Sequence, residues 1–110
     1  MTPEHYQETV RPGLARAMGR PSSWARPDPL HSAEDAEALW TWLEGQGYEV
    51  NLDSDAEHGV TAQLDFAGPR EVCFDLFPGD AGWSDDPALR RRTALVLAAW
   101  QAVQAMEAAP

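Results

Sequence analysis

The sequence predicts an α+β fold, a three-stranded antiparallel sheet with two longer helices packed on one of its faces, preceded by a short N-terminal helix and a Pro-rich loop. Two patterns indicate this fold. Three segments between residues 48 and 76 alternate apolar and polar residues, which is typical of strands with one buried face. Two flanking segments, 33–44 and 87–106, repeat apolar residues at three- and four-residue steps, as amphipathic helices do.

A chain of 110 residues is expected to form one domain with one modest core. We expect that domain to span 1–110, with the short helix and the Pro/Trp loop in 1–30 and an α-β-β-β-α core in 31–110. The net charge of −10 argues against direct nucleic-acid binding, because phosphate contacts require Lys and Arg. Between Asp28 and Pro87 there are fifteen acids against Arg70 alone, so the acidic charge is concentrated in the middle of the chain.

The cysteine content and the hydropathy pattern predict a cytoplasmic protein. Cys73 is the single cysteine, which excludes an internal disulfide and fits a reducing compartment. The first residues lack the basic region and apolar run of a signal peptide. No apolar stretch approaches the roughly 20 residues that a membrane-spanning helix needs.

The N-terminal segment predicts a short, interrupted helix. Thr2 and Pro3 form a helix start, and Pro12 is expected to interrupt or kink the helix. The helix can continue for another turn or two, with Leu14 facing the core and Gly19 placed to end it. The segment 20–30 contains three prolines and is therefore predicted to be a loop, with Trp24 either pinning it to the body of the protein or exposed for contact.

The second helix has the clearest start in the chain. Ser32 is followed three residues later by Asp35, as in a capped helix N-terminus, and Gly45 and Gly47 are placed to end the helix. Trp42 lies at the border of the predicted apolar face, half-buried or on the surface. The predicted inner face consists of Ala36, Leu39, Trp40 and Leu43.

The three strands follow from alternation at a period of two. Their predicted inward residues are Tyr48, Val50 and Leu52, then Val60, Ala62, Leu64 and Phe66, then Val72, Phe74 and Leu76. The connections 53–59 and 67–70 are short and rich in turn-forming residues, which predicts hairpins.

The last helix has the longest apolar stripe, and we expect the rest of the fold to pack against it. Asp86 and Pro87 form its start. Its apolar positions are Leu89, Thr93, Val96, Trp100 and Val103, widened by Leu97 and Met106. Arg90, Arg91 and Arg92 lie near the start, where positive charge opposes the helix dipole. They either pair with the surplus carboxylates or bind an external anion, and pairing is the favoured interpretation.

Parts of the sequence resemble the phage ABA-sandwich family of small phage and prophage proteins. The matching parts are L-A-R-A-M-G at 14–19, H-S-A-E-D-A-E-A-L-W-T-W-L at 31–43, and the Ala-rich segment after a proline at 87–105. The resemblance implies a phage-like accessory protein whose capped helix is followed by strands and an Ala-rich helix, and it supplies no catalytic residues. Arg90–Arg92 depart from the family pattern.

No catalytic, cofactor or metal site is predicted. The acidic turn from Asp53 has His58 and Leu64 where an EF-hand needs glycine and an acid, so a solvated turn is the better interpretation. His5, His31 and His58 share no ligand spacing and adjoin no nucleophile motif. Cys73 is flanked by acids that disfavour a reactive thiolate.

The polar side of the sheet and two loop tryptophans remain as candidate partner-binding residues. If the alternation holds, the polar strand residues point to one side of the sheet and form an acidic surface. This surface either docks on a basic protein, for example one that handles nucleic acid, or only keeps the protein soluble. The candidates are Glu49, Thr61, Gln63, Asp65, Glu71, Asp75, Trp24 and Trp83.

Three functions are consistent with these patterns. The first is a non-enzymatic protein-interaction module, which the acidic middle and the missing catalytic motifs favour. The second is a homo-oligomeric structural protein, suggested by Trp42 and by the edge of the third strand. The third is a small enzyme or ligand-binding domain built on His31, His58 and the acidic turn.

Overall fold

The computed structural model describes residues 2–21, 27–55, 59–65, 71–80 and 82–108. The elements in chain order are α1 (Pro3–His5), η1 (Tyr6–Val10), α2 (Arg11–Ala17), α3 (Ala33–Gly45), β1 (Glu49–Asp55), β2 (Gly59–Asp65), β3 (Val72–Leu76) and α4 (Pro87–Ala108). The predicted Trp24 loop contact, the turn residue His58, the inward residue Phe66 and the connection 67–70 lie outside the described residues.

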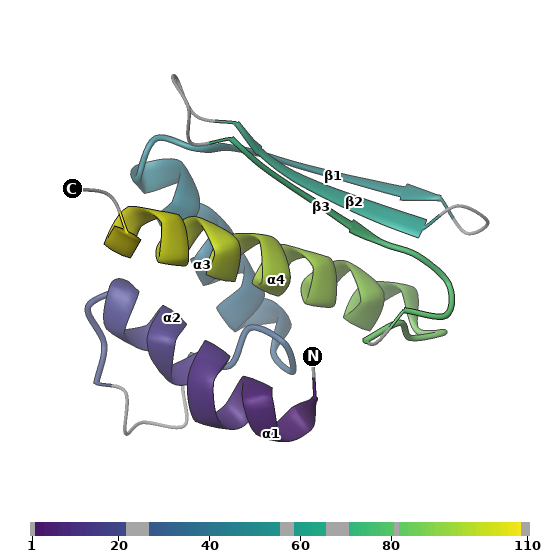
Figure 1. Ribbon diagram of the computed structural model, residues 1–110, viewed down its shortest axis with the longest axis horizontal. Helices are drawn as coiled ribbons and strands as arrows, with labels where there is room; N and C mark the ends of the chain where they lie inside the picture. The colour runs from purple at the N-terminus through teal and green to yellow at the C-terminus, as the bar shows by residue number, and fades with distance from the viewer. Residues whose placement is uncertain (1, 22–26, 56–58, 66–70, 81, 109–110) are drawn as a thin grey trace.

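The α+β prediction is confirmed. The strands form one antiparallel sheet in the order β1-β2-β3, and Figure 1 shows α3 and α4 on the same side of it. The N-terminal helix lies on the far side of α4 from the sheet (Figure 1), so it adds a layer that the sequence pattern did not predict.

Helix α4 is the centre of the core because it is enclosed from two sides. The predicted stripe is present, since Val96 and Val103 are buried. The opposite side is also buried, where small side chains allow neighbouring elements to approach closely. Its fully buried alanines are Ala94, Ala98, Ala99 and Ala102.

The N-terminal helix continues through Pro12 instead of stopping there. Proline lacks an N–H and its ring clashes with the carbonyl four residues earlier in an α-helix. The turn before it is a π-helix, in which the Arg11 N–H donates to the Tyr6 carbonyl oxygen five residues back. This wider turn lets one helix carry Tyr6, Val10 and Leu14 into the core, where all three are fully buried.

The predicted helix ends are confirmed. The Ser32 hydroxyl accepts a hydrogen bond from the Asp35 N–H at 3.2 Å and begins α3. Gly47 has a φ of +99°, and the Tyr48 N–H returns to the Leu43 carbonyl at 3.1 Å, as in a glycine-terminated helix. At the start of α4, the Asp86 carboxylate accepts from the Ala88 N–H at 3.0 Å.

The strand alternation holds across the sheet. Val50 pairs with Leu64, and Leu64 pairs with Val72, so one row of apolar side chains crosses all three strands toward the helices. These three residues are buried, whereas Leu52 is half-buried. Trp42 is half-buried and packs against the core, which decides between its two predicted positions.

The contact between Gly13 and Trp100 leads to a stability prediction. A Cβ atom on Gly13 would overlap the indole ring of Trp100. Gly13→Ala should therefore destabilise the protein by about 1–3 kcal/mol, although alanine is the better helix former. In a Trp100→Leu background the same change should stabilise by about 0.5–1 kcal/mol. Urea denaturation of the four proteins checks this, and an effect of the same sign in both backgrounds would contradict the packing described.

Candidate functional site

The polar residues predicted to share one side of the sheet do so. We call this surface the open sheet face, because the described helices all lie on the other side of the sheet (Figure 1). Its residues are Glu49, Asn51, Asp53, Thr61, Gln63, Asp65, Glu71, Cys73 and Asp75. Five of these nine described residues are carboxylates and none is basic.

Neutral side chains on the central strand hold the carboxylates in place. The Thr61 hydroxyl donates to Asp75 at 2.7 Å. The Gln63 amide donates to Asp65 at 2.9 Å and to Glu71 at 3.1 Å. Three of the five acids are therefore oriented by side-chain hydrogen bonds, which lowers the entropy lost when such a surface binds a partner.

The arrangement of the acids opposes folding. Glu49 and Asp65 are directly opposite each other in the β1–β2 register. Like charges at opposed positions destabilise an antiparallel pair by a few tenths of a kcal/mol to about 1 kcal/mol. A requirement for solubility alone does not explain why the two acids face each other.

Cys73 lies within the open sheet face and is exposed. Partial burial, followed by the carboxylates of Asp75, Glu71 and Asp65, raises the pKa of its thiol. This agrees with the predicted unreactive thiol, since the thiolate is the nucleophilic form.

Trp83 does not join the open sheet face. It lies in the connection between β3 and α4, where its ring packs under the Arg90 guanidinium at 4.1 Å from ring centroid to Cζ. The ring lines a cleft of about 360 Å³ that also contains Tyr6 and His31. Trp83 therefore makes an intramolecular contact on the helical side of the molecule.

The three arginines of α4 have different environments. Arg90 is buried and donates through Nε to the Ser84 carbonyl oxygen at 2.9 Å. Arg92 donates through Nε to the Leu30 carbonyl oxygen at 2.9 Å, which ties the loop before α3 to α4. Their acceptors are main-chain carbonyls, so within the described part of the chain the expected pairing with carboxylates is not formed. Arg91 is exposed.

A polar cluster that the sequence patterns do not predict joins the N-terminal helix to the loop before α3. The Tyr6 hydroxyl donates to Asp28 Oδ1 and accepts from the Leu30 N–H at 3.2 Å. Asp28 Oδ2 lies 3.1 Å from His31 Nδ1, and the Asp28 N–H donates to Asp35 Oδ2 at 2.9 Å. Tyr6 and Asp28 are 22 residues apart and belong to no motif, so no local signal could have identified the pair.

The chemistry of this cluster favours a structural role. Burial and the hydrogen bond to Asp28 raise the pKa of Tyr6 far above its usual value, so the phenol remains a proton donor. His31 has a carboxylate partner, yet within the described residues it makes no hydrogen bond to a hydroxyl or thiol that it could activate. The described residues also contain no group of three or more metal-ligating side chains.

Comparison with family models, with curated proteins and with solved structures found no match. The resemblance to the phage ABA-sandwich family therefore stays a prediction. Within the described ranges, no helix has both the length and the hydrophobicity that crossing a membrane requires.

The position of Tyr6 predicts a pH-dependent contribution to stability. Tyr6→Phe removes a donor to Asp28 and an acceptor for Leu30, and should destabilise the protein by about 1–3 kcal/mol at neutral pH. The raised pKa in the folded state means that this contribution is complete below about pH 10 and is lost as tyrosine ionises in the unfolded chain above it. Urea denaturation at increasing pH should show the difference between the two proteins shrinking above about pH 10. A difference that stays constant would show that Asp28 and burial do not act on this phenol.

Proposed function

We propose that the protein is a non-enzymatic interaction module that docks on a basic surface of another protein through the open sheet face. The observation that carries the proposal is the orientation of Asp65, Glu71 and Asp75 by Gln63 and Thr61 on a face that the described helices leave uncovered. Ordered carboxylates match a partner rich in Lys or Arg, such as a nucleic-acid-handling protein. A phage or prophage context, implied by the family resemblance, is part of this proposal.

The opposition of Glu49 and Asp65 supports the same proposal. Repulsion between the two carboxylates is relieved when a cation from a partner lies between them. The stability lost in the free protein is then recovered in the complex. On the open sheet face the central strand β2 carries neutral Thr61 and Gln63 with one acid, Asp65, whereas the other four acids lie on or beside the two edge strands.

The test removes four charges from the open sheet face and compares the result with a charge-matched control. The face variant is Glu49→Gln, Asp65→Asn, Glu71→Gln and Asp75→Asn. The control variant is Glu4→Gln, Glu8→Gln, Glu44→Gln and Glu107→Gln, which removes four exposed carboxylates from the helices. A basic partner recovered from the native host should bind the face variant at least about tenfold more weakly and the control almost normally.

Two further measurements identify the surface. Binding should weaken steeply between about 50 and 500 mM salt, because screening reduces attraction between exposed charges. The partner should also protect Cys73, the chain's single cysteine, from alkylation. Equal loss of binding in the two variants, or unprotected Cys73 in the complex, would contradict docking at this face.

A homo-oligomer is the second candidate, and a different observation favours it. Phe77 follows edge strand β3 and is 51% exposed, although it is a large apolar side chain. Light scattering should then show a dimer or larger assembly that Phe77→Ser dissociates. A monomer at high concentration would contradict the homo-oligomer. It would leave the proposed docking on another protein unaffected.

A further inference from the structure

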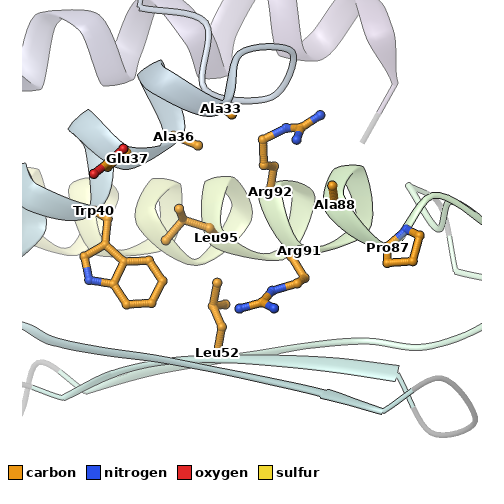
Figure 2. Close-up of a pocket in the computed structure, with 10 residues that line it drawn as sticks. All are labelled: Ala33, Ala36, Glu37, Trp40, Leu52, Pro87, Ala88, Arg91, Arg92 and Leu95. Carbon is orange, nitrogen blue, oxygen red and sulfur yellow. The ribbon is translucent and has the colours of Figure 1, made fainter.

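A cleft of about 500 Å³ lies on the helical side of the sheet, between α3, α4 and β1 (Figure 2). This volume lies within the range of small-molecule sites, roughly 300 to 1,000 Å³. The walls are mainly apolar, with Ala36 and Trp40 from α3, Leu52 from β1 and Leu95 from α4. The cleft is on the opposite side of the sheet from the open sheet face.

The cleft exists because small residues on α3 stand opposite an incompletely covered strand. Ala33 and Ala36 present only methyl groups toward the space above β1. Leu52 belongs to the inward row of the strand, yet it is half-buried while its neighbour Val50 is buried. The inner face of β1 therefore keeps an apolar surface that the helices do not cover.

One cationic side chain enters this apolar space. Figure 2 shows Arg91 extending from α4 toward the sheet, beside Leu52, whereas Arg92 extends to the other side of α4. Arg92 is held by the Leu30 carbonyl and Arg90 by the Ser84 carbonyl. Arg91 has no hydrogen-bond acceptor or ion-pair partner among the residues that the structure describes, so its planar set of N–H donors is available.

The position of Arg91 on α4 strengthens its attraction for an anion. Arg91 lies in the first two turns of a 22-residue helix, where the helix dipole adds positive charge. The neighbouring guanidinium groups of Arg90 and Arg92 donate to neutral carbonyls, which leave their charges in place. A carboxylate bound at Arg91 would therefore contact one guanidinium group directly and lie near the positive end of the helix.

We propose that this cleft binds a small organic acid that has one carboxylate and an apolar body. The carboxylate accepts two parallel hydrogen bonds from the Arg91 guanidinium, and the apolar body lies against Leu52, Leu95 and Trp40. The inference goes beyond the proposed docking function and uses a different surface, so either can fail without the other.

Glu37 restricts the class of ligand further. Its carboxylate lies at the Trp40 end of the cleft in Figure 2, while the Arg91 guanidinium extends beside Leu52. A second anionic group at the Trp40 end would be repelled. The cleft therefore selects a monocarboxylate, with its charged end at Arg91 and its apolar end toward Trp40.

The test uses three defined probes on the full-length protein. Decanoate supplies an aliphatic body, 2-naphthoate an aromatic body, and decylamine the aliphatic body with the opposite charge. Isothermal titration should show saturable binding of decanoate, 2-naphthoate or both, and should show decylamine binding at least about tenfold more weakly. The indole N–H resonance of Trp40, assigned with Trp40→Phe, should shift on addition of the acid that binds. Binding of one acid alone identifies the body as aliphatic or aromatic.

Matched variants locate the binding in the cleft. Arg91→Gln should weaken binding of the acid at least about tenfold, because the loss of a charge-assisted bidentate contact is large. Arg16→Gln removes the same charge from the exposed end of α2 and should change binding less than twofold. Ala33→Leu fills part of the cleft from an exposed position and should also weaken binding.

Three results would overturn the proposal. They are the absence of saturable binding by either acid, equal binding of decanoate and decylamine, and equal effects of the Arg91 and Arg16 substitutions. Circular dichroism and urea denaturation of each variant establish that weaker binding comes from a folded protein. Because the Arg91 and Arg16 side chains are both exposed, neither substitution removes a core contact.

Discussion

The enclosure of α4 on two sides is the constraint on which the rest of the structure depends. A helix that contacts a sheet on one side and another helix on the opposite side must be narrow, and its buried alanines make it so. Each alanine contributes little apolar area, so larger residues of the neighbouring elements fill the core, among them Tyr6, Leu14 and Leu39. Gly13 shows how close the approach is, since the ring of Trp100 occupies the place of its missing side chain.

This central helix also separates two chemically different surfaces. The sheet uses one side to cover α4 and leaves its carboxylates on the other, where Thr61 and Gln63 orient three of them. The arginines of α4 remain on the helical side, two of them bonded to main-chain carbonyls and Arg91 directed into an apolar cleft. A strongly acidic chain therefore keeps a local cationic site, because the sheet stands between that site and most of the strand carboxylates.

Features set by local chemistry were predictable from the sequence. Ser32 and Asp86 begin helices because their side chains accept hydrogen bonds from free amides, whatever the rest of the fold does. Strand alternation predicted that the polar strand residues, from Glu49 on β1 to Asp75 on β3, share one side of the sheet. Successive side chains of a strand point in opposite directions, so every second residue lies on the same side. The α+β class followed from these periodic patterns alone.

Features that depend on the meeting of distant segments could not be predicted in this way. The contact of Trp100 on α4 with Gly13 requires the N-terminal helix, and that helix continues past Pro12 because a π turn accommodates the proline. The hydrogen bond between Tyr6 and Asp28 arises from the same packing. The place of Arg91 in a cleft likewise depends on α3 and β1, because residues of these two elements form the other walls. The positions of the candidate sites in this protein therefore depend on how segments distant in the sequence pack together.

The uncovered side of the sheet has an evolutionary consequence. Several of its side chains hydrogen-bond to one another, while the residues that alternate with them belong to the core. Mutations at these outward positions therefore escape most of the selection that preserves folding. Under the proposed docking function, a few exchanges among the outward residues of β1, β2 and β3 would change the partner recognised and leave the architecture beneath them unchanged.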